Sequence, residues 1–309
     1  MAKILTLTLN PALDLTVELA RLEPGQVNRS DAMHSHAAGK GVNVAQVLAD
    51  LGHTLTVSGF LGEDNAQAFE TLFAQRGFVD AFIRVPGETR SNIKLAEQDG
   101  RITDLNGPGP RVDEAAQQAL LARLEQIAPG HDVVVVAGSL PRGVSPQWLQ
   151  ALVTRLKTLG LKVALDTSGE ALRVALAAGP WLIKPNTEEL ADALGCEVVT
   201  EQAQAQAAQR LHAQGVEHVV ISHGADGVNW FSVGSALHAS PPRSPSPVPW
   251  ARGIRCWRAC CMACSVRIRR SRPCALPRPS PRWRSRRSVS AFMTPRCWRR
   301  LNRACACAP

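Results

Sequence analysis

The composition of this chain changes abruptly after residue 243, and that change limits what the chain can fold into. From Ser244 to Pro309 there is no Asp, Glu or Lys, but there are 16 Arg, eight of the nine Cys and four of the seven Trp. Removing those 16 Arg from the 35 Lys and Arg of the whole chain leaves 19 basic against 26 acidic residues, a net charge of −7. The segment also lacks the periodicity of helices and strands, so a packed core is expected only from residues 1–243.

The first 243 residues have the composition of a globular protein from a reducing compartment. A chain of 309 residues that is 45% hydrophobic is long enough for one large domain or two smaller ones. Residues 1–10 lack the pattern of a signal peptide, and no apolar run approaches the roughly 20 residues that span a bilayer. Cys196 is the single cysteine of this part, which argues against a disulfide framework. These features predict a cytoplasmic protein that does not interact with membranes.

Short apolar runs alternate with helical patterns through residues 1–243. Candidate strands lie at 3–9, 54–60, 133–137, 161–166, 181–184 and 217–222, and candidate helices lie at 41–51, 64–76, 113–127, 145–159, 187–194 and 200–214. The continuous apolar run 133–137 is typical of a strand that is covered on both faces. The alternation predicts an α/β fold in which a parallel sheet carries helices on both faces.

Two segments, 14–22 and 88–105, depart from this alternation. Both have the pattern of short alternating strands, and Asp99-Gly100 is a hairpin signal. We predict that they form a small β-sheet that stands off the main domain as a lid. The regular pattern ends in a run rich in Ser and Pro at 240–247, which excludes a helix or a central strand. We therefore predict one domain, residues 1–243, followed by a non-native or disordered tail, residues 244–309.

Five short motifs, three of which contain glycine, accompany the predicted strands. They are Asn10–Asp14, Gly39–Asn43, Ala137–Gly143, Ile183–Leu190 and Ser222–Gly227. In an open α/β sheet, ligands bind beyond the carboxyl ends of the strands, and a helix start offers free N–H groups to ligand oxygens. Each motif alone is also explained by local structure, as a glycine turn, a turn Asp or an Asn N-cap with a Glu in the first helical turn.

Taken together and in this order, the motifs resemble those of the PfkB-type (ribokinase-like) carbohydrate kinases, and most closely the bacterial branch that phosphorylates fructose 1-phosphate. The resemblance covers residues 1–243 and includes Asn106–Gly109 and Asp166–Gly169, with Ala38 in place of the first family glycine. It implies a ribokinase-like fold and an ATP- and Mg²⁺-dependent phosphoryl transfer to D-fructose 1-phosphate, giving fructose 1,6-bisphosphate. The partners would be ATP and a sugar phosphate, with no specific nucleic acid.

The resemblance also implies roles for individual residues. The sugar phosphate would be held by Asp14, Gly39, Lys40, Gly41, Asn43, Arg90 and Ser139. ATP would be contacted by Lys184, Asn186, Glu189, Ser222, Gly224 and Gly227. Arg90, on the lid, would pair with the phosphate that the substrate already carries, since a planar guanidinium meets phosphate oxygens bidentately. Asn186 and Glu189 would hold Mg²⁺ indirectly, because this cation keeps most of its waters.

The catalytic motif of that family is missing from the chain. The family has Gly-Ala-Gly-Asp at the start of a late helix, where the Asp takes the hydroxyl proton and the helix start stabilises the transferring phosphoryl group. Here Trp250–Arg255 reads WARGIR, with Ile254 at the position of the Asp, so the catalytic residue is unknown. Codons made from the third base of one codon and the first two of the next can encode Gly-Ala-Gly-Asp-Ser there. We interpret the tail as the product of a frameshift near residue 243, natural or a sequencing error, and expect impaired activity.

Other interpretations remain open from the sequence. A sibling kinase could use tagatose 6-phosphate or fructose 6-phosphate, because Arg90 indicates a phosphosugar without placing its phosphate. In another class of function, Arg- and Trp-containing runs such as 282–287 could bind single-stranded nucleic acid. The four Cys clustered within 256–264 could bind a metal, although their spacing matches no paired knuckle and the tail has no His. The lid could also pair two copies into a homodimer.

Overall fold

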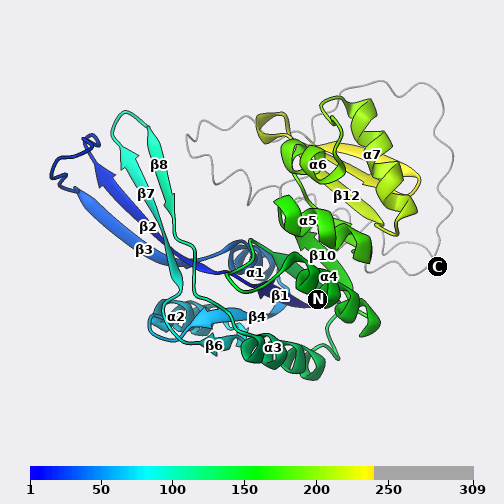
Figure 1. Cartoon of the computed structure of the whole chain (residues 1–309), viewed down its shortest axis with the longest axis horizontal. Coiled ribbons are helices and arrows are strands. Elements are labelled where there is room, and N and C mark those ends of the chain that lie inside the picture. Colours follow the sequence, from blue (N-terminus) through cyan, green and yellow to red (C-terminus); the bar gives the residue numbers. More distant parts are fainter. Residues whose placement is uncertain (240–309) are drawn as a thin grey trace, which may run out of the picture.

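The structure is a computed structural model that describes residues 1–239. Ile254, the Arg-rich runs and the Cys cluster lie outside the described residues, so the predictions made for the tail stay predictions. Within the described part, strands and helices alternate as the sequence predicts (Figure 1). No helix of residues 1–239 is both long and apolar enough to cross a membrane.

A mixed sheet of ten strands organises the fold. Its strands are β1 (Lys3–Thr8), β4 (Thr54–Gly62), β5 (Val79–Asp80), β6 (Ile83–Val85), β9 (Val133–Ala137), β10 (Lys162–Asp166), β11 (Leu182–Ile183), β12 (His218–Ser222), β13 (Val228–Ser232) and β14 (Ser235–Ala239). Their order is β14-β13-β12-β11-β10-β9-β1-β4-β5, with β6 beside β4. The strands from β12 to β4 pair in parallel, which confirms the predicted parallel sheet. The antiparallel hairpin β13–β14 extends it at one edge and was not predicted.

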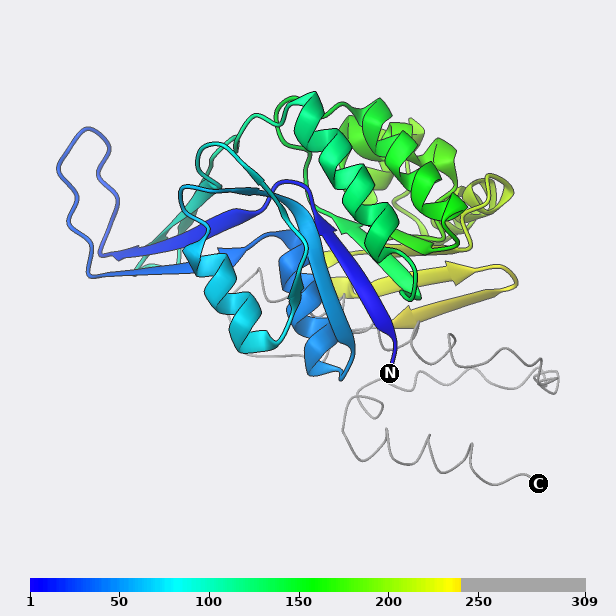
Figure 2. The ribbon, with the colours of Figure 1, turned by 90° about the horizontal axis from the view of Figure 1, so that it is seen from below.

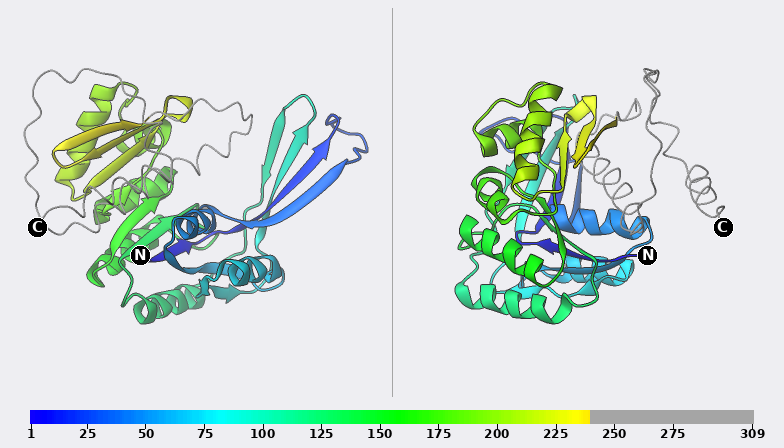
Figure 3. Two further views of the ribbon diagram at one scale, coloured as in Figure 1. Left: turned by 180° about the vertical axis from the view of Figure 1, so that it is seen from behind. Right: turned by 90° about the vertical axis from the view of Figure 1, so that its right-hand side faces the viewer.

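Helices cover both faces of this sheet, as predicted. One face carries α1 (Lys40–Asp50) and α2 (Gln67–Arg76), and the other carries α3 (Glu114–Ile127), α4 (Pro146–Thr158), α5 (Gly169–Ala175), α6 (Thr187–Leu194) and α7 (Glu201–Ala213) (Figures 2 and 3). Successive residues of β9 point to opposite faces, so Val134 and Val136 join one core while Val133 and Val135 join the other. That double burial explains the unbroken valine run. The short helix α5 was not predicted.

A second sheet of four strands projects from the main body (Figure 1). Its order is β3 (Ala32–Ala38), β2 (Ala12–Leu19), β7 (Arg90–Glu97) and β8 (Ile102–Asn106). Strands β2, β7 and β8 correspond to the predicted lid segments, and Gly100, with φ 87°, lies in the turn between β7 and β8. Strand β3 was not predicted because its sequence, AMHSHAA, has little apolar alternation. We call this four-stranded sheet the lid.

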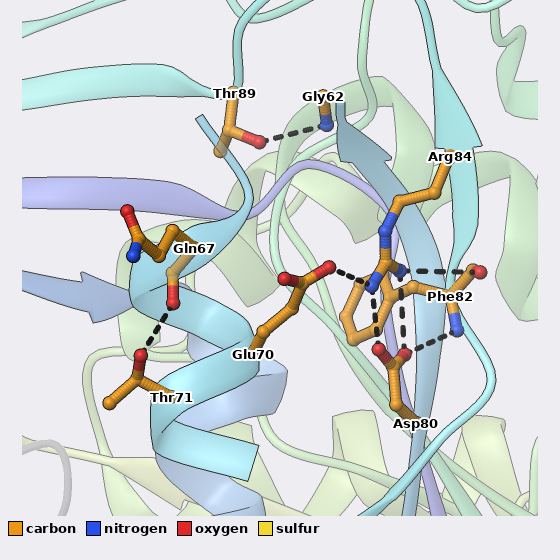
Figure 4. Close-up of polar contacts among 8 residues, drawn as sticks. All are labelled: Gly62, Gln67, Glu70, Thr71, Asp80, Phe82, Arg84 and Thr89. Atoms are coloured by element: carbon orange, nitrogen blue, oxygen red, sulfur yellow. Dashed lines mark hydrogen bonds and ion pairs between the residues drawn. The ribbon is translucent and has the colours of Figure 1, made fainter. Parts of the chain in front are cut away.

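The segment that enters the lid is fixed by polar contacts on the main body (Figure 4). Arg84 of β6 donates to the carboxylates of Glu70 at 2.9 Å and Asp80 at 2.7 Å. Burial alone would lower the pKa of Arg84, but its hydrogen bonds to the two carboxylates outweigh that effect and the pKa is raised. Thr89 Oγ1 accepts a hydrogen bond from the Gly62 amide at 2.9 Å. These contacts hold the chain directly before β7, the strand that begins with Arg90.

Candidate active site

The predicted site residues gather at the carboxyl ends of the parallel strands. Ser139 follows β9, Lys184 follows β11 and Ser222 ends β12. Asp14 lies on β2, a few residues after the end of β1. In an α/β sheet this edge is the expected place for ligands, because the loops there are free to carry functional side chains.

The glycines at the start of α1 are required by close packing against β1. Gly39 is the N-cap and has a φ of 123°, a conformation that disfavours any side chain. A Cβ on Gly41 would lie 2.3 Å from Thr8 Oγ1 and 2.9 Å from the Leu7 carbonyl oxygen. The backbone of α1 therefore starts directly against the sheet, with half-buried Asn43 in its first turn. A structural role accounts for both glycines, and their contact with a sugar stays a prediction.

Asp14 is held on both carboxylate oxygens by the neighbouring strand β7. Asn92 Nδ2 donates to Asp14 Oδ1 at 3.1 Å, and Lys94 Nζ donates to Asp14 Oδ2 at 2.7 Å. The parallel register places Asn92 directly beside Asp14 and Lys94 two residues further along. Sequence analysis did not select Asn92 or Lys94, although their spacing at alternate positions of a predicted lid strand was a usable signal.

Arg90 lies at the junction of the lid and the main body. Its guanidinium donates to three backbone carbonyls, those of Asn10, Pro11 and Gly107, at 3.2–3.3 Å. Burial lowers the pKa of Arg90, and the nearby Asp14 carboxylate opposes that effect. The protein backbone thus uses three N–H groups of Arg90. The N–H groups that remain can donate to a phosphate. Asn10 links the junction to the next loop, donating to Ser139 Oγ at 3.3 Å.

Asp166 lies between two of the predicted binding lysines. Its side chain is 2% exposed, with Lys40 Nζ 3.5 Å from Oδ1 and Lys184 Nζ 3.4 Å from Oδ2. Lys40 belongs to the predicted sugar side and Lys184 to the predicted nucleotide side, so the carboxylate joins the two. Sequence analysis quoted Asp166–Gly169 as a motif but gave Asp166 no role. Its position as the last residue of a buried strand was the signal that pointed to it.

The start of α6 holds two of the predicted ATP-binding residues in a capping box. The Glu189 amide donates to Asn186 Oδ1 at 2.7 Å, and the Asn186 amide donates to Glu189 Oε2 at 2.9 Å. This confirms the capping interpretation that was left open from the sequence. Ser222 lies next to this turn, since its amide donates to the Pro185 carbonyl at 3.0 Å. Lys184, Asn186 and Ser222 are thereby brought together.

The loop after β12 forms a compact turn at the same edge. Gly224, with φ 54°, opens the short 3-10 helix Gly224–Asp226, and Gly227 has a φ of 109°. The amide of His223 donates to the Gly227 carbonyl at 2.8 Å. The His223 ring contacts Gln204 Oε1 at 3.0 Å, and Gln204 also accepts from Asn229. His223 is therefore part of a polar network that fixes this loop.

The donor chemistry at this edge fits a weakly protein-bound Mg²⁺ better than a tight metal site. Residues 1–239 contain no group of three or more His, Cys, Asp or Glu arranged to hold a metal ion. Glu189 uses Oε2 in the capping box, which leaves Oε1 for another partner. A hard cation that keeps most of its waters needs only such isolated oxygens.

A parallel sheet with a lid, an aspartate on the lid, and lysines at the start of α1 and after β11 form a site whose chemistry suits phosphoryl transfer to a small hydroxylated substrate. The chain belongs to the pfkB family of carbohydrate kinases, whose sequence model matches residues 7–248. Membership places the chain among carbohydrate kinases, a kinase family that implies ATP as the phosphoryl donor.

Proteins of similar sequence support this placement in the family. The chain is 49% identical to the 1-phosphofructokinase of Vibrio cholerae over 78% of this chain and 76% of that protein. It is 42% identical to the 1-phosphofructokinase of Haemophilus influenzae over 80% of this chain and 79% of that protein. It is also 42% identical to the 1-phosphofructokinase of Escherichia coli strain K12 over 78% of this chain and 77% of that protein.

Solved structures share the fold at lower identity. The tetrameric inhibited form of phosphofructokinase-2 from Escherichia coli has a TM-score of 0.75 at 29% identity, over 80% of this chain and 82% of that one. The same enzyme in complex with fructose-6-phosphate has a TM-score of 0.72 at 28% identity, over 80% and 82%. A possible 1-phosphofructokinase from Thermotoga maritima has a TM-score of 0.70 at 26% identity, over 78% of both chains.

Proposed function

We propose that this fold binds ATP and D-fructose 1-phosphate, and is that of a kinase that transfers the γ-phosphoryl group of ATP to the sugar phosphate, giving fructose 1,6-bisphosphate and ADP. The observation that carries the proposal is the 49% identity to a 1-phosphofructokinase over most of both chains. These substrates are metabolites of the cytoplasm, where we expect the protein to act.

The sugar phosphate would lie between the lid and the carboxyl end of β1. Asp14 would accept hydrogen bonds from sugar hydroxyls, since a carboxylate that has two donors still has free lone pairs. Arg90 would meet the phosphate with its remaining N–H groups, and Ser139 would add a hydroxyl beside it. Gly39, Gly41 and Asn43 at the start of α1 would border the sugar.

The nucleotide would lie along the ends of β11 and β12. Lys184 and Lys40 lie on either side of the buried Asp166 carboxylate. Their positive charges would lie near the transferring phosphoryl group and stabilise the negative charge that it carries in the transition state. Asn186 and Glu189 would orient the waters of a Mg²⁺ ion that neutralises the phosphates. Ser222, Gly224 and Gly227 would line the nucleotide edge.

The general base would be missing from the protein as it stands. The position of the family aspartate is Ile254. Among the described residues near the strand ends, Asp14 and Asp166 are both paired with lysines and are poor substitutes for a base. Loss of a general base lowers a rate by about 10²–10⁴, and loss of oxyanion-type donors lowers it by a further 10²–10³ or so. We therefore propose turnover near background.

A coupled assay for ADP release tests both parts of the proposal. It compares the full chain with a version in which the neighbouring reading frame is restored after residue 243, on fructose 1-phosphate, fructose 6-phosphate and tagatose 6-phosphate. We expect background turnover from the full chain and clear turnover from the restored version with fructose 1-phosphate. The restored version with its new Asp changed to Asn is the matched control and should be inactive. Ordinary turnover by the full chain would refute the impairment.

Re-sequencing the gene across codon 243 tests the frameshift directly. A single inserted or deleted base relative to a gene that continues as Gly-Ala-Gly-Asp is the expected result. An error-free read that confirms the present frame, with codons that do not encode Gly-Ala-Gly-Asp in the neighbouring frame, would refute that interpretation.

The sibling substrates remain the alternative function, because a similar structure carries fructose-6-phosphate. Faster turnover of a 6-phosphate by the restored version would favour that alternative. Nucleic-acid binding and a Cys metal site involve only the tail, so they make no use of the residues described above.

A homodimer through the lid is favoured by the two unlike faces of this sheet. Leu15, Ile93 and Leu105 are register neighbours on one face, and Leu105 is 52% exposed. The opposite face carries Asp14, Asn92 and Lys94. An exposed apolar face of a sheet favours association with another protein surface. We therefore propose a second copy of this chain as the partner. Sedimentation of the soluble chain as a monomer would count against it.

A further inference from the structure

The face of the lid that carries Asp14, Asn92 and Lys94 contains a side-chain arrangement that the proposed roles in substrate binding do not explain. Both oxygens of Asp14 accept hydrogen bonds, and both donors, Asn92 and Lys94, come from strand β7. Residues at alternate positions of a strand share one face, so a single strand presents its amide and its ammonium to one carboxylate.

We propose that Asn92 and Lys94 are positioning residues, which hold the Asp14 carboxylate in the one orientation that accepts a sugar hydroxyl. The proposal rests on the sugar-phosphate site of the proposed function and adds two residues to it. Lys94 and Asn92 act through Asp14 and make no contact with the substrate phosphate.

The partial burial of the pair gives it the strength for this role. The Asp14 side chain is 14% exposed and the Lys94 side chain 26% exposed, with 2.7 Å between the charged atoms. An ion pair shielded from water on most sides interacts more strongly than one on the surface. A second hydrogen bond from Asn92 then removes the remaining rotational freedom of the carboxylate.

The hydrogen bond from Asn92 to Asp14 leaves the other polar atom of the Asn92 amide without a partner. A carboxylate only accepts hydrogen bonds, so the Asn92 amide must turn its Nδ2 toward Asp14 and its Oδ1 away. Asn92 Oδ1 is buried and has no hydrogen-bond partner among the described residues. A buried acceptor without a donor is unfavourable, and such exceptions are expected where a residue serves a site rather than stability.

Titration calorimetry of fructose 1-phosphate with the full chain tests this inference. The variants are Lys94→Met, Asp14→Asn and the double variant, with Arg101→Met as the matched control. Arg101 is a 62% exposed cation near the hairpin turn and is ion-paired to Glu97 and Asp99 rather than to Asp14. ATP affinity reports whether each variant keeps its fold, and inorganic phosphate serves as a second probe.

We expect Lys94→Met to weaken fructose 1-phosphate binding about tenfold, because a misplaced carboxylate loses its hydroxyl contact. The double variant should bind as weakly as Asp14→Asn alone, while phosphate and ATP affinities stay unchanged. Asn92→Leu, which keeps the branching of the side chain without the donor, should weaken sugar binding in the same way. If Lys94→Met disturbs the fold, Lys94→Gln replaces it, since its amide still donates and should retain part of the affinity.

Two results would overturn the inference. One is unchanged sugar affinity in Lys94→Met. The other is additive loss in the double variant together with weaker phosphate binding, which would make Lys94 a direct phosphate ligand. Absence of any fructose 1-phosphate binding by the unaltered chain would instead overturn the proposed function, and this inference with it.

Discussion

The buried carboxylate of Asp166 provides a sharp test of the candidate active site. Asp166→Asn removes one negative charge and keeps the size and shape of the side chain. The change leaves Lys184, whose side chain is 10% exposed, without the charge that lies 3.4 Å away. Lys40 loses the same partner, but its side chain is 50% exposed and water can replace the lost contact.

The expected loss of stability follows from these exposures. Removing one partner of a buried ion pair costs about 3–5 kcal/mol, because the remaining buried charge loses its opposite charge. The exposed Lys40 contributes no more than about 1 kcal/mol. Asn can still accept a hydrogen bond, so we expect a decrease of about 3 kcal/mol in the free energy of unfolding. Against a typical total of about 5–15 kcal/mol this is a large fraction.

Urea unfolding followed by tryptophan fluorescence measures this loss. Asp166→Asn, Lys184→Met and the double variant form a cycle, and the double variant should recover part of the loss because it removes both charges of the pair. Glu125→Gln is the matched control, since it neutralises an exposed carboxylate paired with Arg155, and it should change stability by less than about 1 kcal/mol. If Asp166→Asn behaves like this control, the reasoning from burial fails.

Two further predictions concern the helix starts at the site. Gly41→Ala should destabilise the protein by about 1–3 kcal/mol, since its Cβ would overlap Thr8 Oγ1 and press on the Leu7 carbonyl; a melting temperature equal to that of the unaltered chain would contradict this. Glu189→Ala should cost about 1 kcal/mol through loss of the capping box at α6, whereas Glu189→Gln should keep the box and weaken Mg²⁺-dependent ATP binding alone. Calorimetric titration of ATP with and without Mg²⁺ checks the second point, and an affinity of Glu189→Gln for ATP in Mg²⁺ equal to that of the unaltered chain would remove the metal role.

The periodicity of the sequence predicted most of the main sheet. The run Val133–Ala137 is buried on both faces, so its apolar character is continuous and its limits were predicted without error. Helices were placed within about three residues because caps such as Ser145 and Thr200 mark their starts. The hairpin β13–β14 and strand β3 were missed. Much of β3 and of β14 is exposed, and an exposed strand carries little apolar pattern.

The candidate site was predicted through its motifs and not through its contacts. The sequence marked Asp14, Lys40 and Lys184 because they stand in recognisable runs beside strand ends or a helix start. It gave no role to Lys94 or Asp166. Lys94 lies 80 residues from Asp14, and Asp166 lies 126 residues from Lys40, and no local pattern reports either pairing.

The sequence alone contained the alternation of strands and helices, the family motifs and the compositional break after residue 243. All three are recorded in the order of residues along the chain. The three-dimensional structure was needed to show that Asp14 is held by β7, that Arg90 binds the backbone at the lid junction, and that one buried carboxylate lies between two lysines. These depend on strand register and loop packing, which bring distant side chains within hydrogen-bonding distance and exclude the water that would otherwise weaken their attraction.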